Sequence, residues 1–185
     1  RNLNLYPDRE YQEGHTYEVR VCDGCVIEDN NQSLESFSWR FNIKETSLDP
    51  VYRFWSPRLA AHFYTASESE KNKLLRDARL SSIWDYEGVA FHALTGDNCV
   101  KGQRVFRFWS DAFQNHFYTI SEQEYLKIQN DPNLGNYWEY EKVAFCAYDY
   151  HRDGTVSVYR FWSPSFGSHF YTHKASEKNK VIEKF

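Results

Sequence analysis

An arginine, a tryptophan, a histidine and a tyrosine recur together along the chain, and all four side chains can bind or orient a ligand. An indole ring offers a flat apolar surface on which a sugar ring can stack, and polar groups beside it fix the ligand's orientation. The pattern therefore predicts a set of ligand-binding residues. They are Arg53, Trp55, His62, Tyr64, Arg107, Trp109, His116, Tyr118, Arg160, Trp162, His169 and Tyr171.

A structural interpretation of the same residues stays open. An arginine over a tryptophan stabilises a fold as a cation–π pair, and a histidine at a strand end can hydrogen-bond a backbone carbonyl. Residues repeated in this way would then hold one supersecondary unit together. The intervening segments at residues 58–61, 111–115 and 165–168 differ in sequence, and they would tune any site that exists.

The candidate residues lie in a motif that occurs three times. Residues 51–75 (VYRFWSPRLAAHFYTASESEKNKLL) are followed by related segments that begin at Val105 and Val158. The first two copies continue to WDYEGVAFHA and WEYEKVAFCA, whereas the third has no such continuation. We expect either a truncated chain, which we favour, or a strand from elsewhere in that place. Residues 36–42 (SFSWRFN) are the candidate for such a strand.

Each copy predicts a strand, a second strand, a helix and a third strand. Alternation along paired strands sorts the side chains onto two faces. One face should carry Tyr52, Phe54, Phe63 and Thr65, and the other Arg53, Trp55, His62 and Tyr64. Serine followed three residues later by glutamate predicts a capping box at Ser67 and Ser121, whereas Lys174 at the third position predicts a weaker helix start.

One copy cannot bury both of its faces, so the three copies should pack together. We therefore expect an α+β fold in which three strand–strand–helix–strand repeats form one pseudo-threefold domain. The repeats lie near residues 51–97, 105–150 and 158–185, within a domain spanning residues 49–185. Residues 1–48 should form separate β structure.

The motifs YRFW, HFYT and YEGVAF resemble an uncharacterised family of triple repeats found in secreted and surface proteins of bacteria and some fungi. The likeness covers about residues 50–185, with Lys142 in place of Gly88 and the absent last strand as departures. It implies a small repeat domain outside the cell that binds carbohydrate or cell wall, with no catalytic residues to carry over. Residues 14–21 and 36–43 resemble the last two strands of a bacterial immunoglobulin-like domain.

Composition excludes several classes of protein. The chain has 185 residues and a net charge of -4, which argues against a nucleic-acid partner. No apolar run reaches the ~18 residues of a membrane helix, so we expect no membrane insertion. The chain begins at Arg1 and contains no methionine, so we expect a processed product or a piece of a longer protein.

The cysteines are Cys22, Cys25, Cys99 and Cys146. The CxxC of the first two lacks the partners of a zinc site and the context of a redox site, so a local disulfide or free thiols are favoured. Cys99 and Cys146 could pair in an oxidising compartment, but the sequence leaves connectivity open. Residues 31–33 form a glycosylation sequon, which matters in a secreting eukaryote.

Motifs for catalysis are not found in the sequence, so we expect no enzyme, no cofactor and no metal. Three histidines meeting on an axis could bind zinc, but this is a remote alternative. Asp85 with Glu87, and Glu139 with Glu141, are interpreted as solvated charges rather than a glycosidase pair. The EDNN run at residues 28–31 is interpreted as a polar loop rather than a calcium site.

The sequence thus favours a non-catalytic binding module that is secreted or on the cell surface. Its expected ligand is a glycan or cell-wall polymer, and its expected role is to target or anchor a larger protein. The alternative is a protein-interaction or assembly module of a surface appendage or secreted complex. A hydrolase fragment is the third and least favoured reading.

Overall fold

The computed structural model describes residues 16–21, 37–42 and 47–184. The chain divides into two compact units, residues 1–46 and 47–185. In the first unit, β1 (Thr16–Val21) pairs antiparallel with β2 (Phe37–Asn42), and Tyr17 stacks on Phe41. Strands were expected in both places, although residues 14, 15, 36 and 43 lie outside the described residues. The immunoglobulin-like assignment of this unit stays a prediction.

The second unit contains every copy of the motif and has mixed α and β character, as expected. Its first copy consists of β3 (Asp49–Ser56), β4 (Ala61–Thr65), α1 (Glu68–Arg76), α2 (Ala78–Ser81) and β5 (Asp85–Ala93). A 3-10 helix, η1 (Gly96–Lys101), leads to the second copy. That copy consists of β6 (Gln103–Ser110), β7 (Asn115–Thr119), α3 (Glu122–Asn130), α4 (Pro132–Gly135) and β8 (Glu139–Ala147). The third consists of β9 (Tyr159–Ser163), β10 (Ser168–Thr172) and α5 (Ala175–Lys184).

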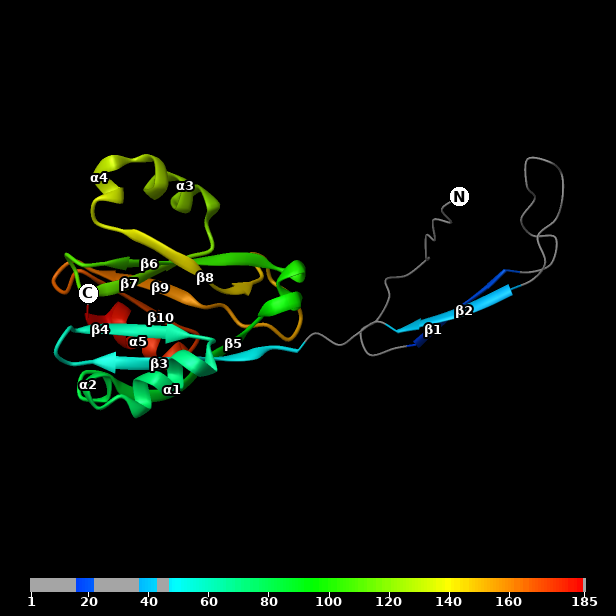
Figure 1. Ribbon diagram of the computed structural model, residues 1–185, viewed down its shortest axis with the longest axis horizontal. Coiled ribbons are helices and arrows are strands. Elements are labelled where there is room, and N and C mark those ends of the chain that lie inside the picture. Colours follow the sequence, from blue (N-terminus) through cyan, green and yellow to red (C-terminus); the bar gives the residue numbers. More distant parts are fainter. Residues whose placement is uncertain (1–15, 22–36, 43–46, 185) are drawn as a thin grey trace. The chain divides into compact units, whose positions relative to one another are not determined.

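The strands form small separate sheets rather than one large sheet. Two sheets have three strands, in the orders β4-β3-β5 and β7-β6-β8, and the sheet of β9 and β10 has two. Figure 1 shows these strands in the middle of the unit, with α1 and α2 beyond one side and α3 and α4 beyond the opposite side. The helices α2, α4 and η1 were not anticipated from the sequence.

The hairpin register agrees with the predicted alternation in all three copies. Arg53 lies opposite Tyr64 and Trp55 opposite His62, and the corresponding residues of the other hairpins pair in the same way. The turn of each hairpin contains a residue with positive φ, namely Ala60 (49°), Gln114 (51°) and Gly167 (57°). A glycine adopts this conformation without strain, whereas an alanine or a glutamine adopts it less readily.

Helices α1 and α3 show one of the two hydrogen bonds that define the predicted capping box. The Ser67 hydroxyl accepts a hydrogen bond from the Glu70 backbone N–H at 3.2 Å, and Ser121 does the same for Glu124. The glutamate does not return to the cap amide, however. The Ser67 N–H instead donates to the Thr65 hydroxyl at 2.9 Å, which leaves the Glu70 carboxylate available for other partners.

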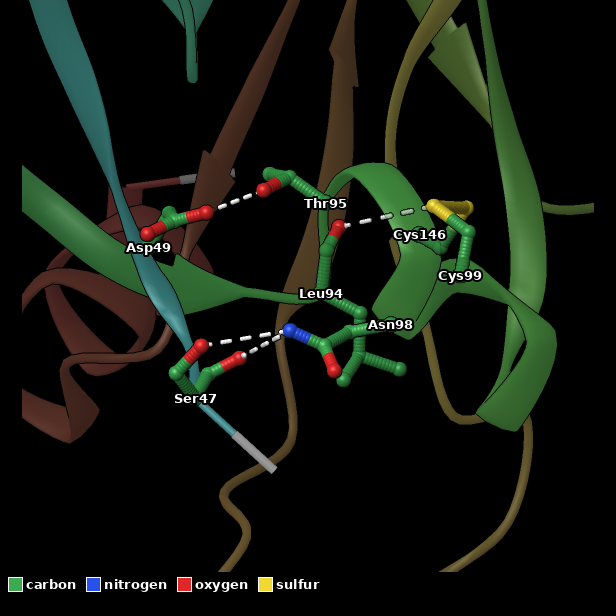
Figure 2. Close-up of a disulfide and its surroundings, with 7 residues drawn as sticks. All are labelled: Ser47, Asp49, Leu94, Thr95, Asn98, Cys99 and Cys146. Carbon is green, nitrogen blue, oxygen red and sulfur yellow. Dashed lines mark hydrogen bonds between the residues drawn. A yellow bond between two sulfur atoms is a disulfide. The ribbon is translucent and has the colours of Figure 1, made fainter. Parts of the chain in front are cut away.

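A disulfide ties the end of the first copy to the second. Cys99 in η1 is bonded to Cys146 in β8 (Figure 2), and the backbones of Leu94 and Cys146 exchange hydrogen bonds of 3.0 and 2.8 Å beside it. On the other side of η1, the Asn98 side-chain amide donates to the backbone and hydroxyl oxygens of Ser47, each at 3.2 Å. The pairing that the sequence left open is therefore present.

Removing this disulfide is expected to lower the free energy of unfolding by about 3 kcal/mol, because it closes a long loop in the unfolded chain. The double substitution Cys99→Ala and Cys146→Ala, followed by urea denaturation, measures the effect. Val100→Ala is the control, since Val100 neighbours Cys99 and its side chain is 88% exposed. A loss no larger than that of the control would contradict the expectation.

Candidate functional site

Three tyrosines meet where β4, β7 and β10 contact one another. The Tyr64 hydroxyl donates to the backbone oxygen of Tyr171, that of Tyr171 to Tyr118, and that of Tyr118 to Tyr64, at 2.7–2.9 Å. Each hydroxyl also accepts the backbone N–H of the same residue to which it donates, at 2.9–3.1 Å. The three residues therefore form a closed cycle, which we call the tyrosine cycle.

The tyrosine cycle is buried, and its rings pack edge to face at centroid distances of 5.5–5.8 Å. Burial raises the pKa of Tyr64, Tyr118 and Tyr171 above the ordinary value. The hydroxyls thus stay protonated and donate at neutral pH. Each hydroxyl bonds the backbone N–H and the backbone oxygen of another tyrosine of the cycle, so its role is structural.

Each arginine of the motif forms a two-bonded ion pair with a glutamate of another copy. Both terminal nitrogens of Arg53 bond the Glu177 carboxylate at 3.0 and 3.1 Å. Arg107 bonds Glu70 at the same distances, and Arg160 bonds Glu124 at 2.8 and 2.9 Å. These bonds connect the third copy to the first, the first to the second and the second to the third. We call the three contacts the seams.

Each seam arginine also lies over a phenylalanine of the other copy. The guanidinium carbon of Arg53 is 5.6 Å from the Phe170 ring, that of Arg107 is 5.2 Å from Phe63, and that of Arg160 is 5.3 Å from Phe117. The suggested arginine–tryptophan stack is therefore wrong for these residues. The tryptophans contact histidines instead, in tilted ring pairs. The ring centroids of Trp55, Trp109 and Trp162 lie 4.6–4.8 Å from those of His62, His116 and His169.

Two exposed carboxylates, which were interpreted as solvated charges, also form ion pairs. Glu87 lies 2.8 Å from Nε of Arg53, and Glu141 lies 2.7 Å from Nε of Arg107. Each also approaches the histidine of its own hairpin, His62 at 3.4 Å and His116 at 3.3 Å. Asp85 and Glu139, the other members of the suggested pairs, are exposed as well.

The seam glutamates stay ionised down to acidic pH. Burial alone would raise the pKa of Glu70, but hydrogen bonds from Arg107, Lys142 and Thr65 outweigh it and lower that pKa to about 2. Burial would likewise raise the pKa of Glu177, but hydrogen bonds from Arg53 and Thr172 outweigh burial and lower that pKa to about 2. These carboxylates were missed as site residues, although their recurrence in the motif was visible.

The three histidines of the motif, His62, His116 and His169, are neutral at physiological pH, and we call them the seam histidines. Burial lowers the pKa of His169 to about 4, assisted by the positive charge of Arg160, while Glu124 opposes. Burial and Arg53 lower the pKa of His62 to about 4 as well. Each imidazole packs on a phenylalanine of another copy: His62 on Phe170, His116 on Phe63 and His169 on Phe117. The histidines thus lie in different seams rather than around one zinc ion.

Acid should weaken the fold from pH 6.5 downward because of these histidines. The unfolded chain takes up the proton near pH 6.5 and the folded chain only near pH 4, so the stabilisation is present above pH 6.5 and is lost as the pH falls toward 4. His169→Gln should flatten the fall in unfolding free energy by up to about 1.4 kcal/mol per pH unit. The exposed His151→Gln is the control, and an unchanged slope in His169→Gln would refute the assignment.

A pocket lies in the seam between the first two copies. Phe63, Leu74, Leu80 and Trp84 form its apolar wall, and Glu70, Lys73, Arg107 and His116 contribute polar groups. Two of the predicted site residues, Arg107 and His116, therefore come together with Trp84 and Lys73, which sequence reasoning had not selected. Ligand contact by the full set of predicted residues stays a prediction.

The remaining expectations concern the motifs of the first unit, metal binding and membrane insertion. Cys22, Cys25, the sequon and the EDNN run lie outside the described residues. Within residues 16–21, 37–42 and 47–184, no group of three or more His, Cys, Asp or Glu is arranged to hold a metal ion. No helix in the same ranges is long and apolar enough to cross a membrane.

Comparison with known proteins gives a family but no characterised relative. No curated protein matches the chain. No solved structure matches it either. Residues 11–133 and 129–184 match a family described as a domain of unknown function, DUF5648, so the match includes β1 and β2 as well as the three copies. The expectation of an uncharacterised family is confirmed, while the particular repeat family suggested by the motifs stays a prediction. The chain belongs to the DUF5648 family.

Proposed function

We propose that the three copies form one closed, pseudo-threefold domain that acts as a non-catalytic binding module. The tyrosine cycle and the three arginine–glutamate seams support closure, because each copy bonds both of the others. Closure fixes the relative positions of the copies, so that side chains from two copies can form one site.

The proposed ligand is a carbohydrate or cell-wall polymer, and the observation that carries this is the pocket of the first seam. Trp84 and Phe63 offer ring surface, while Lys73 and the Arg107–Glu70 pair offer donors and acceptors at its side. Sugar sites combine an aromatic platform with a few polar groups that orient hydroxyls. The half-buried Trp55 and Trp109 and the more exposed Trp162 would add contacts at the edges of the seams.

The proposed setting is extracellular, either secreted or on a cell surface. The Cys99–Cys146 disulfide supports it, because disulfides form and persist mainly in oxidising compartments. In that setting the domain would target or anchor a larger protein, and several weak sites on one chain would gain from avidity.

Glycan-array binding followed by calorimetry with isolated cell-wall polysaccharides tests the proposal. Lys73→Ala is the informative variant, because this exposed lysine lines the pocket and its removal should spare the fold. It should weaken binding about tenfold, as expected for the loss of a hydrogen bond from a charged group. Arg76→Ala, on the same helix but not in the pocket wall, is the matched control.

Trp162→Ala examines the contribution of an exposed ring outside the pocket. If it weakens binding as well, the ligand extends along the seams. An array with no bound glycan, together with no binding to any wall polymer, would remove the carbohydrate proposal.

A further inference from the structure

The pocket of the first seam lies between two copies that both have their third strands, β5 and β8. Its volume is about 190 Å³, below the roughly 300–1,000 Å³ of pockets that hold drug-sized molecules. The pocket therefore has room for one ring of a ligand. That ring would lie against the apolar wall, which consists of Phe63, Leu74, Leu80 and Trp84.

Trp84 in this wall has fewer ring partners than its counterpart in the second copy. The Trp138 indole pairs with Phe113, at 5.7 Å between ring centroids, in addition to the phenylalanine of its own hairpin. In the first copy Leu59 stands at the position of Phe113. Among the described residues, Phe63 is the one ring paired with Trp84, at 6.0 Å. That side of the Trp84 indole is left without an aromatic partner, and the ring of a ligand can take its place.

Most polar groups of the pocket are already bonded within the protein. Each guanidinium nitrogen of Arg107 bonds a carboxylate, Nε that of Glu141 and both terminal nitrogens that of Glu70. Glu70 also accepts a hydrogen bond from Lys142. The Nε2 atom of His116 lies 3.3 Å from Glu141, and burial lowers the pKa of His116, so this imidazole is neutral. The two cations of this network therefore balance its two carboxylates.

Lys73 is the remaining polar residue of the pocket, and its charge is not balanced in this way. It forms no ion pair with the residues that the structure describes, whereas Lys71, two positions earlier, bonds Glu68 at 2.5 Å. The Asp77 carboxylate at the end of the same helix accepts two backbone N–H groups at the start of α2. Lys73 therefore places one uncommitted positive charge beside the apolar wall.

We propose that this pocket selects acidic saccharides: the apolar face of one sugar ring stacks on Trp84, and a carboxylate or sulfate on that ring bonds the Lys73 ammonium. The inference rests on the proposed carbohydrate function and adds the charge of the ligand to it. A neutral sugar leaves Lys73 without a partner, and an anion without a ring loses the contact with the apolar wall. Because Lys73 is exposed, added salt weakens the selection.

Calorimetry on the full chain with two matched pairs of probes tests the proposal. The first pair is a trisaccharide of galacturonic acid and its methyl ester, which has the same rings without the charges. The second pair is a sulfated galactose trisaccharide and its unsulfated form, which distinguishes a sulfate from a carboxylate. The protein should bind the anionic member of at least one pair about tenfold more tightly. Lys73→Gln should bind both members alike, Lys73→Arg should restore the preference, and Arg76→Gln, outside the pocket wall, should keep it.

Several results would overturn the proposal. Equal affinity for the charged and the neutral member of both pairs would remove charge selection and leave the carbohydrate function standing. A preference that Lys73→Gln retains would assign the selection to another cation. An indole N–H resonance of Trp84 that does not shift when the acidic sugar binds would place the ligand elsewhere. No binding of any saccharide, here or on the glycan array, would instead remove the proposed function itself.

Discussion

Replacing Tyr118 with phenylalanine is expected to lower the free energy of unfolding by about 4 kcal/mol. The Tyr118 hydroxyl donates to the Tyr64 backbone oxygen at 2.7 Å and accepts the Tyr64 backbone N–H at 3.0 Å. Without it, a buried donor and a buried acceptor in β4 both lose their partner. The hydroxyls of Tyr64 and Tyr171 are equivalent in this respect, because each also serves one backbone donor and one backbone acceptor.

Urea denaturation of Tyr118→Phe measures this loss, and Tyr150→Phe is its control, because Tyr150 is 62% exposed. Tyr64→Phe and Tyr171→Phe should cost about the same as Tyr118→Phe. A loss in Tyr118→Phe equal to that of the control would mean that the cycle does not hold the copies together.

Replacing Arg107 with glutamine is expected to cost about 4 kcal/mol, because breaking a buried ion pair leaves an uncompensated charge. Arg107 is 5% exposed and bonds both Glu70 and Glu141. Burial alone would lower the pKa of Arg107, but the hydrogen bonds and negative charges of its partners outweigh burial and raise that pKa. The guanidinium therefore stays charged.

Arg160→Gln is the matched control within the same chain. Arg160 occupies the equivalent position, but its side chain is 40% exposed and Glu124 is its one ion-pair partner among the described residues. Solvent-exposed pairs contribute little, so this change should cost about 1 kcal/mol or less. Equal losses from the two substitutions would contradict the assignment of Arg107 to a buried network.

Local structure in the copies could be predicted because strand alternation leaves little choice. Once YRFW and HFYT are strands joined by a short turn, Arg53 must lie on the face of Trp55, and His62 on that of Tyr64. The observed register follows this pattern. The serine cap was predictable for a similar reason, since it depends on residues three apart in the sequence.

Contacts between copies could not be predicted in the same way. Glu70 meets Arg107 across 37 residues, and this depends on how one hairpin packs against another. For the same reason the ion pair of Glu87 with Arg53 was not predicted, and Arg53 was expected over a tryptophan rather than over Phe170. Alternation placed Trp55 and Tyr64 on one face, but it did not show that the tyrosine would lie at the centre.

Native-state hydrogen exchange at the amides of Tyr64, Tyr118 and Tyr171 tests most directly whether the three copies act as one body. Each of these amides donates to a hydroxyl from another copy. A closed domain predicts that all three exchange with one common free energy, equal to that of global unfolding, and that Tyr118→Phe lowers all three together. Three different exchange free energies, or a loss confined to Tyr64, would contradict closure.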